Sequence, residues 1–510
     1  MIGNDRGDNI VTGYGGVLVS EKRRGYLWSL IPAVLAVVMA VGVFLIGKPE
    51  ELLSGDFAIV ILAIATGYLV FAIWAMNSIN KKTLTENTAG KGAGMVVGIL
   101  IFALIVRIYI TSMISGYPSD MSCWTAWSSA AGSDGLFQIY SNMSFIDYPP
   151  GYIYILHIIG SIGKMTGIEC GTETYDLLLK IPAIISDIIM GWMIYRLCSK
   201  KFMHKLGLVL AFLYVMNPLV LLDSAAWGQI DSILTLAVAG YLLALYKENI
   251  IWATLIFIAG LLIKPQMIFF GPVLAVVFIQ YIIKAGWVKA IKTFLISLFS
   301  GVALFALVVF PFTGDKPWYW IFEKYMGTIN SYDYITLNSA NLYGLFGWNW
   351  MPTDTVKFGL TLETWGLIGL IATVVIYFVA GFINRDKKNI FMLTAMLMTG
   401  VYAFGLKMHE RYLFPVIAIL LIAYIYDNKK SILAKFSILT TAVFINVAQV
   451  LAVIHIPPDD LIFKISSGVV VGTYIWIAIY CFIEAVKSNK ESKINHAETT
   501  DDVMSFSPPE

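Results

Sequence analysis

Residues 57–77 read FAIVILAIATGYLVFAIWAMN and contain no charged side chain. An α-helix rises about 1.5 Å per residue, so this run can cross the roughly 30 Å hydrocarbon layer of a bilayer. Similar runs recur along the 510-residue chain, which is 58% hydrophobic and 13% charged. Soluble domains carry about 25% charged residues. Because such runs are too long for barrel strands, the sequence predicts an all-α polytopic membrane protein.

The apolar runs predict a bundle of about 14 transmembrane helices. Basic links such as RLCSKKFMHK (196–205) alternate with poorly basic ones, and the positive-inside rule places the basic set and both termini in the cytoplasm. We expect a cytoplasmic segment at 1–25, a membrane domain at 26–487 and a disordered tail at 488–510. The expected spans are 26–47, 57–77, 93–115, 176–197, 204–222, 227–246, 250–263, 266–283, 291–311, 358–383, 389–406, 411–427, 433–455 and 462–486.

One apolar segment does not fit this topology as a span. Residues 151–166 would reach only about 24 Å as a helix. Counting them as a crossing would also move the basic link at 196–205 to the outside. We therefore interpret them as a juxtamembrane or re-entrant helix, which makes 116–175 one large outer loop. Of the four cysteines, Cys123 and Cys170 are then outside, and Cys198 and Cys481 lie near the inner side.

Several classes of site are excluded or disfavoured. No Walker or Gly-rich phosphate fingerprint occurs, and no soluble segment is large enough for a nucleotide-sugar domain. The formal net charge of +2 suggests no nucleic-acid partner. The four cysteines lack metal-site spacing, and the first outer loop has no Asp-x-Asp, so we predict no metal and no cofactor.

Unusual polar residues converge on the predicted outer mouth of the bundle, from five separate links. Such convergence on one membrane face is typical of a functional site. These residues are Asp120, Asp147, Asp223, Gln229, Asp231, Lys264, Gln266, His409, Glu410 and Arg411.

Two of these residues belong to the large outer loop. Asp120 precedes Trp124 and Trp127 on one helical face, which can present a carboxylate above an aromatic surface. Alternatively, Asp120 is an N-cap and the tryptophans are interface anchors. In DYPPGY, Asp147 can cap the helix that the prolines start, or it can line a site with Tyr148.

The remaining candidates lie where the chain turns at the membrane. A carboxylate as deep as Asp231 is expensive without a partner. Lys264 can belong to a site or merely snorkel. In KMHERYLFP, from Lys407, adjacent ionisable residues cannot all share one exposed face, and Arg411 suits bidentate phosphate binding. Arg107 and Asp187 fall at similar depth within spans, so a structural ion pair is expected.

At these motifs the sequence resembles a known class of enzymes. An outer-loop Asp followed by Trp, and then DYPP, resembles the GT-C fold glycosyltransferases, including the dolichyl-phosphate-glucose glucosyltransferases. WGQIDS, KPQ and HERYLFP together resemble the prokaryotic PIG-V-like mannosyltransferases, relatives of GPI mannosyltransferase II. The resemblance covers roughly residues 93–430. Two additional N-terminal spans depart from the simplest arrangement of that family.

The resemblance implies a large first outer loop with juxtamembrane helices, a polyprenyl-phosphate sugar donor and inversion at the anomeric carbon. Asp120 matches the catalytic base, and Asp147 would bind substrate or support the base. The segment from His409 to Tyr412 would face the donor phosphate. Physical chemistry agrees, because an acceptor hydroxyl needs a general base, whereas a phosphate leaving group needs cations, such as Arg411 with His409 or Lys264.

The sequence therefore predicts a multi-pass membrane glycosyltransferase with its active site facing the outside, or the lumen of the endoplasmic reticulum in a eukaryote. It would transfer a hexose, with mannose favoured, to a glycan, lipid or protein acceptor in contact with membrane lipid. A flippase or transporter for lipid-linked glycans is an alternative, although no inverted repeat is evident. A glycan polymerase or ligase is a third possibility.

Overall fold

The structure is a computed structural model, and it describes residue 34 and residues 37–46, 56–78, 89–133, 135–330 and 332–505. The longer helices are α2 (Asp56–Ser78), α4 (Ala89–Met113), α5 (Pro118–Ser133), α7 (Pro150–Thr166), α8 (Glu173–Ser199), α9 (His204–Val215), α11 (Asp231–Tyr246), α12 (Ile250–Ile263), α13 (Gly271–Ala285), α14 (Trp287–Val309), α15 (Trp320–Asn330), α17 (Leu362–Ile383), α18 (Ile390–Phe404), α19 (Phe414–Asp427), α20 (Lys430–Val453) and α21 (Leu461–Ser505). Short helical elements are η2 (Leu136–Gln138), α6 (Ile139–Asn142), α10 (Pro218–Leu221), η3 (Leu222–Trp227), η4 (Pro265–Phe270), η5 (Phe310–Phe312), α16 (Leu342–Leu345) and η6 (Lys387–Asn389).

The predicted all-α polytopic membrane fold is confirmed. Within the described residues, eight helices are long and apolar enough to cross a membrane. A ninth crossing results if α9 and the following α10–η3 segment, bent by 47°, form one broken span. Every predicted span from 57–77 onward coincides with helix, and 37–46 is a short apolar helix within the predicted span 26–47. The total of 14 crossings remains a prediction, and the segment 1–25 lies outside the described residues.

Several helices of the bundle are too short to cross a bilayer alone, among them α11, α12, α18 and α19. These four helices contain 16, 14, 15 and 14 residues. They therefore reach only about 21–24 Å, against about 30 Å of hydrocarbon. Polar groups at their ends lie close to the apolar layer and need partners inside the protein.

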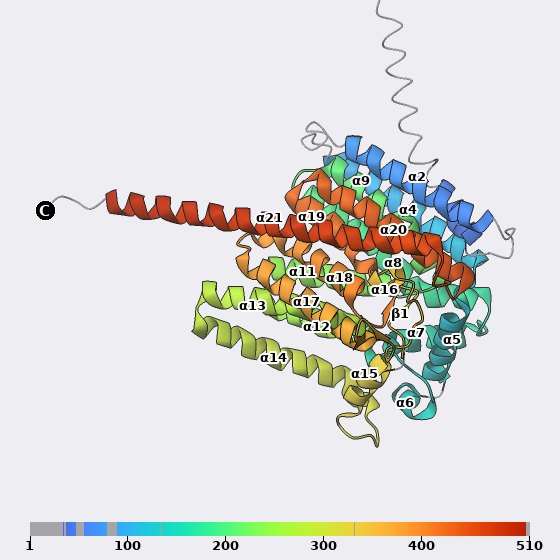
Figure 1. The fold of residues 1–510 in the computed structure, drawn as a ribbon. Helices are drawn as coiled ribbons and strands as arrows, with labels where there is room; N and C mark the ends of the chain where they lie inside the picture. The colour runs from blue at the N-terminus through green and yellow to red at the C-terminus, as the bar shows by residue number, and fades with distance from the viewer. Residues whose placement is uncertain are drawn as a thin grey trace, which may run out of the picture.

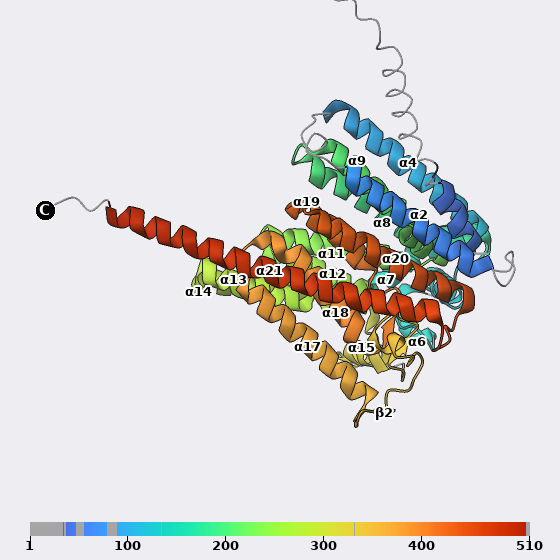
Figure 2. The ribbon, with the colours of Figure 1, turned by 45° about the horizontal axis from the view of Figure 1, so that its top comes forward.

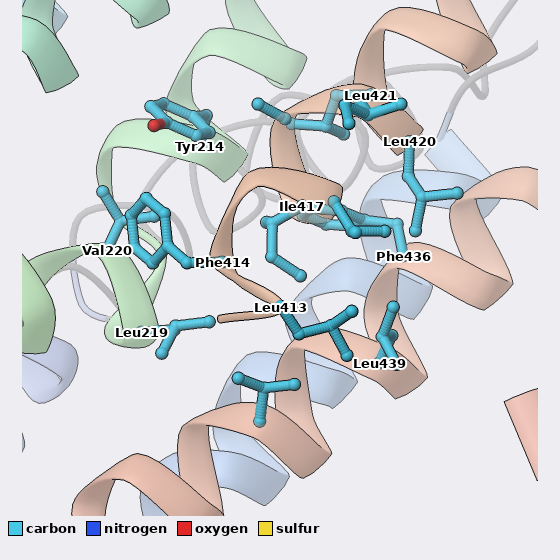
Figure 3. Close-up of a cluster of buried hydrophobic side chains, with 14 of the residues drawn as sticks. Tyr214, Leu219, Val220, Leu413, Phe414, Ile417, Leu420, Leu421, Phe436 and Leu439 are labelled. Atoms are coloured by element: carbon cyan, nitrogen blue, oxygen red, sulfur yellow. The ribbon is translucent and has the colours of Figure 1, made fainter. Parts of the chain in front are cut away.

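Helices α18 and α19 form the centre of the bundle. Residues 390–403 of α18 and 414–425 of α19 are all buried. Figure 3 shows how Leu413, Phe414 and Ile417 meet Leu219 and Val220 of α10, while Phe436 and Leu439 of α20 flank the other side. This interdigitation on all sides excludes lipid from α19 and fixes the position of the chain that precedes it.

The irregular segments gather at one end of the bundle, here called the loop end (residues 114–172, 312–361 and 405–413). Figures 1 and 2 both place α6, α7 and α15 there, far from the turn that joins α13 to α14. At this end β1 (Thr336–Leu337) pairs in parallel with β4 (Met408–His409), and β2 (Val356–Lys357) pairs antiparallel with β3 (Leu360–Thr361). The first pairing holds the segment between α18 and α19 against the chain that follows α15.

The opposite end, here called the basic end, joins the links that the sequence predicts to be cytoplasmic. Lys284 pairs with Glu248 at 2.6 Å, and Lys388 lies 3.8 Å from Asp427. The Nζ of Lys201 donates to the carbonyl of Ile425 at 2.9 Å. Links far apart in the sequence thus meet at one end, as the positive-inside prediction requires. Which side this end faces in a cell remains a prediction.

Helix α7 corresponds to the segment that we interpreted as non-spanning. The prediction that Asp147 caps this helix is wrong, because Pro149 occupies the N-cap position and Pro150 the first turn. Proline fits there because its missing N–H would have no helical partner. Helix α7 packs closely on α5, where a Cβ added to Gly160 would lie 1.9 Å from the carbonyl oxygen of Ser128.

The C-terminal helix is longer than the sequence predicts. We expected the last span to end at residue 486 and a disordered tail to follow, whereas α21 continues to Ser505. In Figure 1, α21 extends beyond the rest of the bundle. The Lys, Glu and Ala residues after 486 are good helix formers and can continue a helix that the apolar span has already nucleated.

All four cysteines are free. Cys123 lies in α5 at the loop end. Cys170 interacts with Tyr175, whose hydroxyl lies 2.8 Å from that of Ser128 in α5, so Cys170 belongs to the same end.

Candidate functional site

Asp120 lies in the first turn of α5 and is partly exposed. Its Oδ2 accepts hydrogen bonds from the indole Nε1 of Trp227, at 2.7 Å, and from the amide Nε2 of Gln229. Asp120 is therefore held by the short segment between α10 and α11, about a hundred residues away in the sequence. Neither bond reaches Oδ1, which leaves that oxygen for another partner.

The segment that leads into α5 also contacts Trp227 through its backbone. The N–H of Tyr117 donates to the carbonyl of Trp227 at 3.0 Å, and the two rings stack with centroids 4.6 Å apart. Gly116, with φ +113°, makes this approach possible, because an added Cβ would lie 2.6 Å from the Trp227 carbonyl oxygen. Trp227 itself ends a π-helical turn, η3, a geometry frequent at functional sites.

Trp227 also contacts the segment between α18 and α19. The guanidinium of Arg411 lies over the indole ring, 5.2 Å from its centroid. Arg411 Nη1 donates to Glu410 Oε1 at 2.5 Å, and its Nε lies 3.5 Å from Asp231 Oδ2. One indole therefore contacts both the carboxylate of Asp120 and the cation of Arg411.

Asp231 begins α11 and joins two cations. Its Oδ1 accepts from Lys264 Nζ at 2.7 Å, and both side chains are only 1% exposed. Lys264 follows the last residue of α12 and Arg411 precedes α19, so the ends of three short helices meet here. The positive end of the α11 dipole stabilises the Asp231 carboxylate further.

Asp223, in η3, is the least compensated charged residue of the site. It is fully buried, and neither carboxylate oxygen has a hydrogen-bond partner among the described residues. Asp231, Lys264 and Arg411 are near enough to act on it electrostatically. A buried polar group without hydrogen bonds is costly, so Asp223 is not explained by packing alone.

The expected ion pair between Arg107 and Asp187 is confirmed. Arg107 Nε lies 3.1 Å from Asp187 Oδ2, and both side chains are fully buried. Ser224 and Ser232 donate to the same carboxylate at 2.6 and 2.5 Å. These serines follow Asp223 and Asp231 in the sequence, so the pair fixes the segments that carry both aspartates.

His409 lies half-buried in β4, with the rings of Tyr332 and Tyr412 centred 5.0 and 5.1 Å from its own. Burial, assisted by the charges of Arg411 and Lys264, lowers the pKa of His409 to about 3. Its imidazole is therefore neutral at neutral pH. The lowered pKa disfavours a charged His409 beside Arg411, but its role as a second cation stays a prediction, and a neutral ring can also form hydrogen bonds.

Glu410 is buried beside Arg411, and Gln266 lies next to Tyr412. Burial raises the pKa of Glu410, and the neighbouring guanidinium opposes that shift. The Oε1 atoms of Gln266 and Gln229 are buried without a hydrogen-bond partner in the described part of the chain. Both amides thus retain an acceptor that a ligand hydroxyl could use.

The aromatic part of the outer loop is mainly core. Trp124 is 2% exposed and packs edge-on against Tyr148, at 4.7 Å, and Tyr152, at 5.1 Å. Trp127 donates its Nε1 to the carbonyl of Phe145 at 2.9 Å. Trp124 and Trp127 thus join α5 to α7 and are not exposed anchors, whereas Tyr148 remains partly exposed.

Asp147 lies in the segment that precedes α7 and is half-buried. Burial raises its pKa, and the charge of Asp120 raises it further, against the opposing effects of Lys324 and Arg411. Among the described residues, no other side chain forms a hydrogen bond or an ion pair with this carboxylate. Its role as a helix cap is excluded, so its position near Asp120 lacks a purely local explanation.

Two residues that contact this region were not predicted from the sequence. Tyr117 stacks on Trp227, and Lys324 of α15 acts on Asp147. Tyr117 directly follows Gly116 at a membrane exit, which is a common place for an interfacial aromatic, so it carried no distinctive signal. Lys324 is a single lysine in an aromatic segment, WYWIFEKYMGTIN, and its position depends on how α15 folds back.

Within the described residues, no group of three or more His, Cys, Asp or Glu side chains is arranged to hold a metal ion. A family model described as GPI transamidase subunit PIG-U matches residues 130–342. This match covers less than half of the chain and includes Asp223, Gln229, Asp231 and Lys264, but neither Asp120 nor Arg411. No curated protein matches the chain.

Proposed function

We propose that this protein is a membrane glycosyltransferase that moves a hexose, with mannose favoured, from a polyprenyl-phosphate donor to a hydroxyl group of a glycan, lipid or protein acceptor. The observation that supports this most directly is the double contact of Trp227. Its N–H donates to Asp120, and its ring lies beneath Arg411. A proton acceptor and a phosphate-attracting cation are thus held on one rigid side chain.

Asp120 is suited to act as the general base. Both of its hydrogen bonds reach Oδ2, so Oδ1 is available to the acceptor hydroxyl. In the proposed step, Asp120 takes the hydroxyl proton as the acceptor oxygen attacks the anomeric carbon. The bond from that carbon to the phosphate oxygen breaks, its electron pair leaves with polyprenyl phosphate, and the configuration inverts.

Arg411 would stabilise the negative charge that grows on the leaving phosphate. A planar guanidinium can bind two phosphate oxygens at once, which a lysine cannot. Its present partners, Glu410 and Asp231, orient the guanidinium before the donor arrives. Because one of these carboxylates is hydrogen-bonded to Arg411 and the other forms an ion pair with it, a donor phosphate would have to displace or share them.

The match to the PIG-U model favours a second candidate function. In this alternative the chain binds a lipid-linked glycan as a subunit of a larger assembly and performs no transfer itself. The match includes the buried Asp231–Lys264 pair but omits Asp120 and Arg411. A subunit of this kind would need the buried pair for folding and would tolerate loss of the proposed base.

Transfer from defined donors separates these functions. Purified protein in lipid nanodiscs is incubated with radiolabelled mannosyl, glucosyl and galactosyl polyprenyl phosphates and with acceptor extracts of the source membranes. We expect label to move from one donor, and transfer to be lost in Asp120→Asn. Asp354→Asn, an exposed aspartate at the same end, is the matched control. Transfer that persists at full rate in Asp120→Asn would contradict the proposed mechanism.

A further inference from the structure

The two cations that the sequence assigns to the donor phosphate already have carboxylate partners. Arg411 is engaged by Glu410 at 2.5 Å and by Asp231 at 3.5 Å. Lys264 is engaged by Asp231 at 2.7 Å and is 1% exposed. A phosphate would have to compete with these carboxylates, whose hydrogen bonds to charged donors are among the stronger ones in proteins. A cation without a carboxylate partner is better placed to make the first contact with an incoming lipid phosphate.

Lys324, in α15, meets that description. It is half-buried, and no carboxylate lies within 4.0 Å of its Nζ in the described part of the chain, although Asp147 acts on it from farther away. Its ammonium lies 5.8 Å from the ring centre of Tyr140. Burial lowers the pKa of Lys324. A partly desolvated ammonium that has an aromatic neighbour and no carboxylate in direct contact retains the capacity to bind an anion.

Helix α15 is anchored beside the site. The hydroxyl of Tyr325 donates to the carbonyl of Leu261 at 2.9 Å, three residues before Lys264. The Oγ1 of Thr328 donates to the carbonyls of Lys324 and Asp147, at 3.0 and 3.4 Å. These contacts fix Lys324 between the end of α12 and the turn that carries Asp147.

The other face of α15 is apolar and exposed. Phe322 and Met326, spaced four residues apart in α15, are 54% and 56% exposed, and Trp318, just before the helix, is 80% exposed. Eleven residues reach only about 16 Å, too short to cross a bilayer. An amphipathic helix with aromatic residues on its apolar face lies in the plane of the membrane interface. Phe310, at the end of the adjoining membrane helix α14, is also exposed, so this apolar face continues the lipid-facing surface.

We propose that α15 lies in the membrane interface and that Lys324 binds the phosphate of a polyprenyl-phosphate lipid as it approaches the site. This inference rests on the proposed function, of which it names the phosphate-recognising residue and the face of approach. The apolar side of α15 would contact the lipid chain, while Lys324, on the opposite side, meets the phosphate beside Asp147. The interface is the depth at which a lipid phosphate resides, so the helix and the ligand occupy the same layer.

The test is direct binding of farnesyl phosphate, a short polyprenyl phosphate, to the full-length protein in phosphatidylcholine nanodiscs. Loss of a hydrogen bond to a charged group predicts about 10- to 100-fold weaker binding by Lys324→Gln. Lys324→Arg should retain binding, and binding of farnesol, which lacks the phosphate, should not change. Lys316→Gln is the matched control, because Lys316 also lies near an aromatic ring, that of Trp320 at 5.4 Å.

Several results would overturn this assignment. The first is undetectable binding of farnesyl phosphate by the wild-type protein, and the second is binding by Lys324→Gln that is as tight as that of the wild type. The third is a loss of farnesol binding in Lys324→Gln as large as the loss of farnesyl phosphate binding. Inorganic phosphate or phosphatidylglycerol, at the same concentration as farnesyl phosphate, should not displace the ligand. Displacement by either would mean that Lys324 binds phosphate groups in general, and it would reject the proposed specificity for a polyprenyl phosphate. The measurement needs no sugar transfer. If farnesyl phosphate binds through Lys324 but no donor is turned over, the proposed function fails and this inference stands.

Discussion

Replacement of Asp120 by Asn tests the proposed base with little structural damage. Both hydrogen bonds converge on Oδ2, from Trp227 Nε1 and Gln229 Nε2. The amide oxygen of Asn can take that place and accept both bonds. Each bond then changes from charge-assisted to neutral, at a cost of about 1 kcal/mol. The variant should therefore fold, while its transfer rate falls about 10²- to 10⁴-fold, or about 3–5 kcal/mol in the barrier.

Asp120→Ala provides the contrast. It leaves two buried donors, on Trp227 and Gln229, without an acceptor. Each unsatisfied donor costs about 1–3 kcal/mol, so this variant should melt at a lower temperature than Asp120→Asn. The assays are donor turnover in nanodiscs and thermal unfolding followed by intrinsic fluorescence. The reasoning is refuted if Asp120→Asn turns over donor like the wild type, or if Asn and Ala destabilise the protein equally.

The remaining predictions concern buried charge and topology. Burial raises the pKa of Asp147 above the ordinary value of 3.8, so ionising this carboxyl group as the pH rises above about 4 destabilises the fold. Asp147→Asn should therefore melt at a higher temperature than the wild type at pH 7, and the difference should vanish below about pH 4. An unchanged melting temperature at pH 7 would contradict this. Arg107→Met leaves Asp187 unpaired and should lower the free energy of unfolding by about 3–5 kcal/mol in a denaturation titration. Adding Asp187→Leu should recover part of that loss. If Arg107→Met were as stable as the wild type, the ion pair would not contribute to stability. In single-cysteine proteins, an impermeant maleimide should label Cys170 on intact cells but label Lys284→Cys only after permeabilisation. Labelling of both from one side would reject the topology.

The sequence predicted the membrane class and nearly all helix positions because apolar periodicity and length carry that information directly. It also predicted the depth match of Arg107 and Asp187, since rise per residue converts position in a span into depth. It failed at Asp147, because proline can start a helix without a side-chain cap. It also failed to anticipate the helical extension to Ser505, because a polar composition alone does not stop a helix that is already formed.

The sequence by itself predicted that polar residues such as Asp120, Asp231 and Arg411 stand at helix ends on one face of the bundle. Tertiary structure decided which of them touch. The contact of Trp227 with both Asp120 and Arg411 depends on the π-helical turn of η3 and on the central position of α19. The lowered pKa of His409 and the placement of Lys324 likewise arise from contacts with distant segments. Hydrogen bonds and desolvation depend on distances of a few ångströms between residues remote in the chain, and no local pattern encodes those distances.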